Sequence, residues 1–399
     1  MPAGSPAAPP AGRLAAYYFC HFATLGGMLP FLPLFFAARG FTPVQVGQLL
    51  AVFLCTKLVA PNVWGLLADR RGRLIGLVRG GSLLAAIGFA GLLVEGGFWW
   101  TAAIIAVFSF FWNAALPLFE GVTLRHLGRD VGRYSRIRLW GSIGFLLVAA
   151  GYGPLLSRYS AAALPALLLP LFIAIWLCSL LVPEPAAAAG GEEGDRATLW
   201  PVLRQPMVIG YFAMLFLTHL SHGAYYGFFS LYLETLGYGR GIIGAFWAVG
   251  VLAEVVLFLA MPRLLRYATP RTLMLGALAL TALRWGLTAT LAAEPAVLVP
   301  VQMLHAASFG ICHALGMHYL YGFFPGALQG RGQGLYSSLS FGAGGSVGAL
   351  VSGYLWGWQG GSAAFLAAMA FALGALLVAA CTLPETSRRA LPEGWTRIA

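Results

Sequence analysis

The sequence predicts an all-α membrane protein in which twelve transmembrane helices form two pseudo-symmetric halves of six. Hydrophobic residues make up 59% of the 399 residues, the mean hydropathy is +0.80, and only 9% of the residues are charged. A soluble chain carries about 25% charged residues, so this chain cannot cover its surface with polar groups. Because long apolar runs recur from end to end, we expect lipid to cover much of the molecule.

A helix needs about 20 apolar residues to cross the hydrocarbon core of a bilayer. The first apolar run is too long for the core of a signal peptide and has no small-residue cleavage site after it, so we expect an uncleaved span. Most gaps between runs are too short to hold a domain. The predicted spans are 14–38, 43–67, 74–95, 98–122, 134–156, 160–182, 205–233, 240–262, 271–292, 295–321, 333–357 and 361–383.

The distribution of arginine predicts how the spans are oriented. With the N-terminus in the cytoplasm, 18 arginines fall in cytoplasmic segments or adjoining helix ends, and only Arg39, Arg158 and Arg240 fall outside. Cytoplasmic loops of membrane proteins are enriched in Lys and Arg. We therefore expect a bacterial inner-membrane protein with both termini in the cytoplasm. The net charge of +11 is then a topology signal, and we expect no nucleic-acid partner.

The longest polar stretch, residues 183–204, divides the spans six and six. Its Pro, Ala, Gly and acidic residues are typical of a flexible linker. We therefore expect an N-terminal bundle (1–182), a cytoplasmic linker (183–204) and a C-terminal bundle with a short tail (205–399). Tyr134-Ser135 recurs as Tyr336-Ser337 and Gly151-Tyr152 as Gly353-Tyr354, both at an offset of 202 residues, which indicates duplicated halves.

Residues 65–73, Gly-Leu-Leu-Ala-Asp-Arg-Arg-Gly-Arg, follow the second span and resemble the signature loop of the major facilitator superfamily. The resemblance implies the major facilitator fold and a transport function. In that family the loop is a conformational latch rather than a binding site, which assigns this role to Gly65, Asp69, Arg70, Gly72 and Arg73. An ordinary basic loop is the alternative interpretation.

A narrower resemblance follows from four further segments. Residues 117–120 (Pro-Leu-Phe-Glu) and 136–142 (Arg-Ile-Arg-Leu-Trp-Gly-Ser) resemble lactose permease, where a glutamate and an arginine on spans four and five pair and bind substrate. This implies the same role for Glu120 and Arg138. Residues 302–310 and 333–336 resemble the related phenylpropionate permease branch. The chain departs from lactose permease at Ser308, where that family has the proton-carrying carboxylate.

Five charged residues are candidates for ionisable groups buried within the spans: Lys57, Glu120, Arg138, Glu254 and Arg284. A charge at the bilayer centre costs about 2.5–3.5 kcal/mol on insertion scales, so each needs a partner or a wet cavity. If Glu120 pairs with Arg138 and Glu254 with Arg284, Lys57 is left over. We expect an anionic substrate to bind Lys57 or an arginine. Snorkelling of Glu120 and Arg138, and ion pairs that only fix helix packing, are the alternatives.

Proton coupling needs a group whose proton affinity changes during transport. Glu254 is the first candidate, because burial favours the protonated carboxyl and a nearby Arg284 favours the carboxylate. His305 is the second, since histidine titrates near neutral pH, and Gln302 lies one turn before it on the same helix face.

Further substrate-binding candidates are polar or aromatic residues in the spans. His219 and His222 stand one turn apart on span seven, Asn113 can add a polar contact, and aromatic rings offer stacking surface. The rings can equally serve packing or a lipid belt, and Asn113 can be a satisfied packing residue. A metal site at the two histidines would need a third ligand, and we expect none and no cofactor. The aromatic candidates are Tyr225, Tyr226, Trp247, Phe111, Trp112 and Trp285.

These features together predict a monomeric secondary transporter rather than an enzyme. Patterns such as His-Glu-x-x-His, Gly-x-Ser-x-Gly and a phosphate-binding loop are absent from the sequence. The leftover cation favours proton-coupled uptake of a small aromatic carboxylate such as 3-phenylpropionate, by alternating access around a site between the halves. A proton symporter of a neutral sugar, oligosaccharide or nucleoside, and a drug or metabolite exporter, remain alternatives.

Overall fold

The computed structural model describes residues 10–128, 132–185 and 199–385, without the side chains of Asp69, Gly132 and Ala327. Within these ranges all regular structure is helical. The N-terminal half contains α1 (Ala11–Ala38), α2 (Pro43–Arg71), α3 (Leu74–Ala90, continued by η1, Gly91–Leu93), α4 (Phe98–Leu127), α5 (Gly132–Tyr159) and α6 (Leu164–Leu181, preceded by η2, Ala161–Ala163).

The C-terminal half follows a short helix, α7 (Trp200–Leu203). Its first three spans are α8 (Pro206–Thr235), α9 (Arg240–Tyr267) and α10 (Pro270–Leu291). The next span is continuous from α11 (Pro295–Met303) through the π-helical η3 (Ala306–Ile311) to α12 (Cys312–Phe323). After η4 (Gly326–Leu328) comes α13 (Gln329–Tyr336), the π-helical η5 (Ser337–Gly344) and α14 (Gly345–Gln359); α15 (Gly361–Thr382) ends the described fold.

The prediction of an all-helical, twelve-span membrane fold is confirmed. Eleven helices in the described ranges are long and apolar enough to cross a membrane. The remaining predicted span, 333–357, corresponds to the helix formed by α13, η5 and α14, which begins earlier than expected. Its first turns carry Gln329, Arg331 and Gln333, which lower its hydropathy at one end.

Loop residues define several helix ends. Thr42 begins α2 with a capping box, in which its hydroxyl accepts from the Gln45 amide and the Gln45 side chain accepts from the Thr42 amide. Pro43 stands at the first position of that helix, where its missing N–H costs nothing. Gly72 ends α2 with φ of +66°, a conformation that favours glycine.

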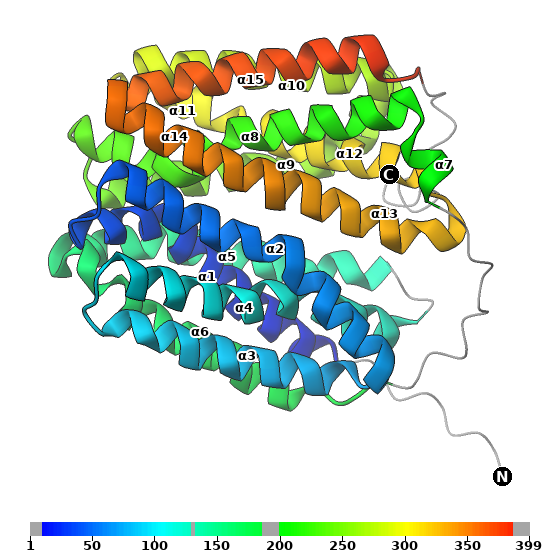
Figure 1. Ribbon diagram of the computed structural model, residues 1–399, viewed down its shortest axis with the longest axis horizontal. Coiled ribbons are helices and arrows are strands. Elements are labelled where there is room, and N and C mark those ends of the chain that lie inside the picture. The colour runs from blue at the N-terminus through cyan, green and yellow to red at the C-terminus, as the bar shows by residue number, and fades with distance from the viewer. Residues whose placement is uncertain (1–9, 129–131, 186–198, 386–399) are drawn as a thin grey trace.

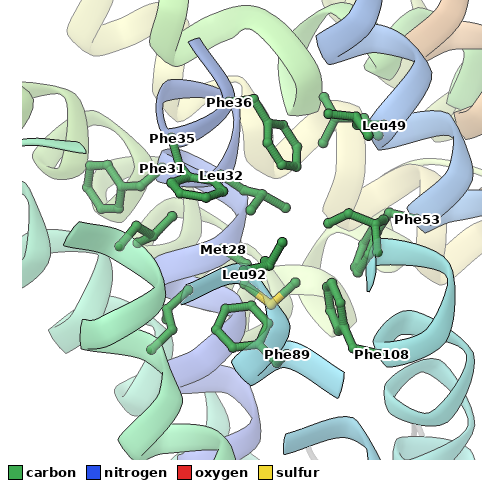
Figure 2. Packing of buried hydrophobic residues seen from close by; sticks show 14 of the residues in the cluster. Met28, Phe31, Leu32, Phe35, Phe36, Leu49, Phe53, Phe89, Leu92 and Phe108 are labelled. Carbon is green, nitrogen blue, oxygen red and sulfur yellow. The ribbon is translucent and has the colours of Figure 1, made fainter. Parts of the chain in front are cut away.

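The two halves lie side by side as two helical bundles (Figure 1). Each has its own apolar interior. In the N-terminal half, the ring of Phe108 of α4 contacts those of Phe53 of α2 and Phe89 of α3, and Phe31 and Phe35 of α1 belong to the same apolar cluster (Figure 2). In the C-terminal half, one cluster fills the space between α8, α10, α12 and α15. A second lies between α8, α9, α10, α11 and α15 and extends to Phe145 and Ala149 of α5 in the other half. Aromatic burial of this kind contributes much of the packing energy.

The most extensive contacts between the halves are made by two helix pairs, α2 with α14 and α5 with α9. In span order these are the second with the eleventh and the fifth with the eighth, so the two contacts are pseudo-symmetric. The backbones meet at the end of the bundle that carries residues 39–42 and 236–239, which we call the closed end. There a Cβ added to Gly47 would lie 2.7 Å from the Ala349 carbonyl oxygen, and one added to Gly244 would strike the Ala149 carbonyl.

A polar contact also joins the halves at the closed end. Arg240, the first residue of α9, donates to the Leu156 carbonyl of α5 at 2.8 Å. The same guanidinium donates to Glu234, near the end of α8, at 2.8 Å. Arg240 therefore links the ends of α8 and α9 to the opposite half.

In the N-terminal half, the third and sixth helices are tied together at the opposite end. Arg79 of α3 donates to the carbonyls of Ser179, Leu180 and Val182, where α6 ends. In return Glu184 accepts from the Leu74 amide at 2.8 Å, at the positive end of α3.

The C-terminal half repeats part of this arrangement. Arg271 of α10 donates to the Ala380 carbonyl near the end of α15 and lies 3.5 Å from Glu385. We call these two sets of contacts the third-to-sixth clamps. One joins α3 to the end of α6 through Arg79 and Glu184, and the other joins α10 to the end of α15 through Arg271 and Glu385. They join equivalent helices in the two halves.

Candidate functional site: a cavity between the halves and a buried arginine network

A cavity of ≈ 170 Å³ lies between the two halves. Its walls come from α1 and α2 on one side and from α8, η3, η5 and α14 on the other. The polar side chains in the lining are Lys57, His219, His222 and Tyr226, all of them candidates from the sequence. The rest of the lining is apolar or glycine, including Phe53, Phe309 and Phe341.

Lys57 faces this apolar cavity without a carboxylate beside it. Its ammonium nitrogen lies 5.5 Å from the centre of the Phe341 ring. Among the described residues, the ion pairs that the structure contains do not include Lys57. A cation over a ring gains some energy, but a buried ammonium needs an anion to offset the loss of water.

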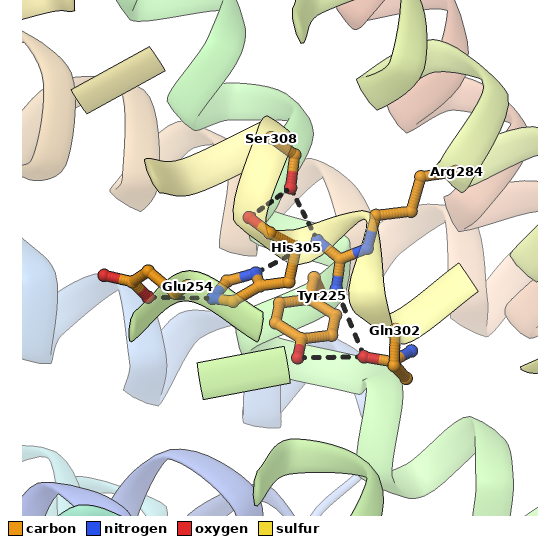
Figure 3. A network of polar contacts seen from close by, with 6 residues as sticks. All are labelled: Tyr225, Glu254, Arg284, Gln302, His305 and Ser308. Carbon is orange, nitrogen blue, oxygen red and sulfur yellow. Dashed lines mark hydrogen bonds and ion pairs between the residues drawn. The ribbon is translucent and has the colours of Figure 1, made fainter. Parts of the chain in front are cut away.

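A second polar cluster surrounds Arg284 of α10, which is fully buried. Its guanidinium donates to Ser308 Oγ at 2.8 Å, to His305 Nδ1 at 3.2 Å and to Gln302 Oε1 at 3.2 Å (Figure 3). It also lies over two rings, 4.2 Å from the centre of Tyr225 and 4.4 Å from that of Trp285. Neutral acceptors and ring faces thus hold a charge that the sequence analysis paired with Glu254.

His305 lies between Arg284 and Glu254 (Figure 3). A guanidinium can only donate, so His305 Nδ1 must accept, and the imidazole proton of the neutral ring is on Nε2. That nitrogen lies 3.7 Å from Glu254 Oε2, which is beyond hydrogen-bond length. The three groups form a chain in which a small movement would let the imidazole donate to the carboxylate.

The π-helical η3 begins directly after His305 and contains Ser308. A π turn holds an extra residue and displaces the side chains that follow it. Such turns concentrate at functional sites. Here the π turn brings His305 Nδ1 and Ser308 Oγ to the same guanidinium nitrogen.

Tyr225 and Trp247 lie behind the cavity rather than in its lining. Tyr225 donates to Gln302 Oε1 at 3.2 Å, and its ring centre is 4.5 Å from that of Trp247. Trp247 in turn donates to Ser230 at 2.9 Å. These two rings therefore support the Arg284 network. Of the six aromatic candidates, Tyr226 is in the cavity lining, whereas Tyr225, Trp247, Trp285, Phe111 and Trp112 are not.

Three N-terminal candidates also lie outside the cavity lining. Asn113 donates to the Phe53 carbonyl and to Thr56, which satisfies its amide between α4 and α2. Glu120 accepts from Tyr134 at 3.4 Å. Arg138 lies 3.7 Å from the centre of the Phe22 ring. The described contacts include no ion pair between Glu120 and Arg138, because each uses a different partner in this conformation.

In the structure, residues 65–71 of the signature segment form the last turns of α2, and Gly72 and Arg73 connect α2 to α3. Arg70 is exposed, Gly72 ends α2, and Arg73 precedes α3. A Cβ at Gly65 would meet nothing within 4 Å, so this glycine makes no close helix contact in this conformation. The side chain of Asp69 is outside the described part. The acidic residue found at the start of α3 is Glu184, which the sequence analysis did not select.

Sequence reasoning also missed Phe309 and Phe341 as cavity residues. The centre of the Phe341 ring lies 4.3 Å from that of the His219 ring, on the wall that faces Lys57 across the cavity. Phe341 precedes a glycine-rich run that begins at Gly342. The signal that could have identified Phe341 is a large aromatic residue directly before a run rich in glycine.

A family model described as MFS_1 like family matches residues 12–367. The chain belongs to the MFS_1 like family. It is therefore a major facilitator transporter, a multi-pass membrane protein that acts as a secondary transporter and not as an enzyme. This confirms the resemblance found in residues 65–73 and in the later segments.

Two relatives cover most of this MFS_1 like chain. A protein described as a probable 3-phenylpropionic acid transporter from Escherichia coli (strain K12) is 30% identical over 366 residues, covering 87% of this chain and 91% of that protein. Maltose permease of Geobacillus stearothermophilus is 26% identical over 370 residues, covering 91% and 92%. The solved nucleoside transporter NupG has a TM-score of 0.77 at 18% identity, covering 94% and 98%, which supports the fold.

Proposed function

We propose that this transporter takes up a small aromatic carboxylate, such as 3-phenylpropionate, together with protons. It would work by alternating access in a bacterial inner membrane, as a monomer with both termini in the cytoplasm. We further propose that residues 183–204 are a cytoplasmic linker between bundles 1–182 and 205–399. Similarity to the probable 3-phenylpropionic acid transporter supports the substrate class.

The observation that carries this proposal is the position of Lys57. It is the cation in the lining of the cavity, and the described ion pairs leave it without a carboxylate. A substrate carboxylate would supply the missing anion and form a charge-assisted hydrogen bond. The carboxylate would stabilise only those conformations in which Lys57 faces it. Such a difference in affinity between conformations is how substrate binding can drive a conformational change.

The remaining lining favours a ring over a sugar. Phe53, Phe309 and Phe341 offer faces and edges for an aromatic body. A sugar would bury many hydroxyls in a cavity that presents few polar partners, and unpaired hydroxyls are costly. The cavity volume of ≈ 170 Å³ is also below the roughly 300–1,000 Å³ of drug-sized sites. These points favour the aromatic acid over the maltose-like alternative.

Glu254 is our proposed proton carrier. Ser308 occupies the position where lactose permease has its carboxylate, and here its hydroxyl accepts from Arg284. Glu254 is then the carboxylate nearest to the Arg284 and His305 chain among the described residues. We propose that Glu254 holds a proton while His305 separates it from Arg284, and releases it when the helices bring the guanidinium closer.

The orientation predicted from arginine assigns a transport state to this conformation. If both termini are cytoplasmic, the closed end with residues 39–42 and 236–239 faces outward. The backbone contacts at Gly47 and Gly244 would then seal the outer side. We propose that the structure represents an inward-facing state.

Uptake into proteoliposomes tests the substrate. We expect labelled 3-phenylpropionate to accumulate under an imposed pH gradient, and Lys57→Met to reduce its uptake at least about tenfold, the equivalent of 1.4 kcal/mol. Lys57→Arg is the matched control that keeps the cation. Unchanged uptake in Lys57→Met would rule out the role of Lys57. No uptake by the wild type would reject the substrate and direct the assay to sugars, nucleosides and export.

The coupling residue is tested in the same vesicles. Glu254→Gln keeps the shape and removes the titratable group, so we expect exchange of internal for external substrate to persist while gradient-driven accumulation is lost. Glu95→Gln, an exposed carboxylate outside the spans, is the control and should accumulate normally. Accumulation by Glu254→Gln at the wild-type level would exclude Glu254 as the carrier.

A further inference from the structure

The cavity wall opposite Lys57 carries two imidazoles with a defined polarity. His219 and His222 stand one turn apart on α8 and both line the cavity. The Nδ1 atom of His219 is 2.9 Å from the Leu215 carbonyl, and that of His222 is 2.8 Å from the Thr218 carbonyl. A carbonyl can only accept, so each Nδ1 carries a hydrogen.

The other nitrogen of each ring is then an acceptor. A neutral imidazole has a single N–H, and a protonated one here would add a further cation to a wall that already faces Lys57, without an anion to offset it. The Nε2 atom of His222 is buried and has no hydrogen-bond partner among the described atoms, and the hydrogen bond described for His219 uses Nδ1 alone. A buried acceptor without a donor is unfavourable.

The acceptors and the cation belong to opposite halves of one cavity. Lys57 comes from α2 and the histidines from α8. The centre of the Phe341 ring lies 5.5 Å from the Lys57 ammonium nitrogen and 4.3 Å from the centre of the His219 ring. A ligand that fills the cavity therefore meets a donor cation on one side and two imidazole rings on the other, one of which holds a buried acceptor without a donor.

We infer that the preferred substrate is a hydroxylated aromatic acid, whose carboxylate binds Lys57 and whose ring hydroxyl donates to the Nε2 of the histidine pair. This deepens the proposed function and depends on it. A plain phenyl ring would leave the His222 acceptor unsatisfied, whereas a phenol supplies one O–H donor at the far end from the carboxylate. Such a substrate bridges α2 and α8, so its binding energy depends on how the two halves are positioned.

The first test compares ligands on the wild-type protein. The 2-, 3- and 4-hydroxy derivatives of 3-phenylpropionate compete with the labelled parent acid for uptake, each against its methoxy counterpart, which keeps the oxygen and removes the donor. We expect at least one hydroxy isomer to compete at a concentration about tenfold or more below both its methoxy counterpart and the parent acid. If every hydroxy isomer is no better than its counterpart while the parent is transported, the inference fails and the proposed function stands.

The second test uses the histidine. His222→Gln retains an acceptor oxygen and His222→Leu removes it, and the readout is the ratio of hydroxy to methoxy affinity within each variant. We expect that ratio to fall to nearly one in His222→Leu and to recover in His222→Gln, with His219→Leu and His219→Gln showing which ring dominates. A loss of packing alone would weaken both ligands and leave the ratio unchanged, which would overturn the inference. If no aromatic acid competes at all, the proposed function fails as well.

Discussion

Arg284 shows how one buried residue organises a group of polar side chains in this transporter. Its guanidinium reaches three neutral acceptors from the span that contains η3 and stacks on Tyr225 and Trp285. A planar fork of donors suits this arrangement, because the acceptors lie in different directions around it. The guanidinium Nε remains without a partner among the described atoms. The network is therefore specific to arginine rather than to positive charge.

Arg284→Lys tests this at the level of the residue. Lysine keeps the charge but cannot reach His305, Gln302 and Ser308 together, and each buried acceptor left without a donor costs about 1–3 kcal/mol. We expect substrate exchange to fall at least about tenfold and the melting temperature in detergent to drop. Arg158→Lys makes the same substitution at an exposed position and is the control; its exchange rate and melting temperature should match those of the wild type. Wild-type exchange in Arg284→Lys would show that charge alone suffices.

At the scale of helices, glycines determine how closely the two halves approach. Gly47 of α2 lies against Ala349 and Gly353 of α14, and a Cβ there would be 2.7 Å and 3.1 Å from backbone atoms of these residues. No rotation of a side chain relieves such a contact, because the neighbour is backbone. A larger residue therefore forces the helices apart at the closed end.

We expect Gly47→Val to populate the state in which the closed end is open, and to abolish transport by preventing reclosure. Hydrogen exchange measured by mass spectrometry should become faster in residues 43–50 and 345–353. Gly76→Val is the matched control, since a Cβ at Gly76 meets nothing within 4 Å. Exchange rates in Gly47→Val equal to those of the control would contradict the role of this contact.

Much of the helix arrangement could be predicted because hydropathy reports membrane crossing directly. The same pattern did not reveal η3 and η5, since an extra residue in a helix turn leaves the apolar run intact. The sequence analysis grouped Glu254, Arg284, His305 and Gln302 as candidates, and in the structure these four side chains lie together. It did not show that His305 separates Glu254 from Arg284, because the order of side chains across neighbouring helices depends on helix rotation, which one sequence does not encode locally.

At the scale of the whole molecule, the interface between the halves repeats itself. Spans two and eleven meet as spans five and eight do, and both pairs approach at the closed end. In the proposed alternating-access cycle, such a pseudo-symmetric pair of contacts would let one half rock against the other around a central cavity. That motion would have to break the hydrogen bond from Arg240 of α9 to the Leu156 carbonyl of α5.

The charge distribution predicts which side of the membrane each end faces. Because 18 arginines were assigned to one side and Arg39, Arg158 and Arg240 to the other, we expect a reporter fused after Ala399 to be active only in the cytoplasm. A second reporter inserted in the loop at Gly237, at the closed end, should be active only outside. Reversed activities would invert the orientation and turn the proposed inward-facing state into an outward-facing one.

The third-to-sixth clamps bear on whether the two halves need to be one polypeptide. Arg79 and Glu184 hold α3 and α6 together with contacts made entirely within the first half, and Arg271 binds the end of α15 entirely within the second. Neither clamp borrows an atom from the other half. If the chain were divided between residues 185 and 199 and the two pieces were made from separate genes, each should insert and keep its own helices in place. The pieces should then recover transport when they meet in the membrane, which would allow halves from different members of the family to be recombined.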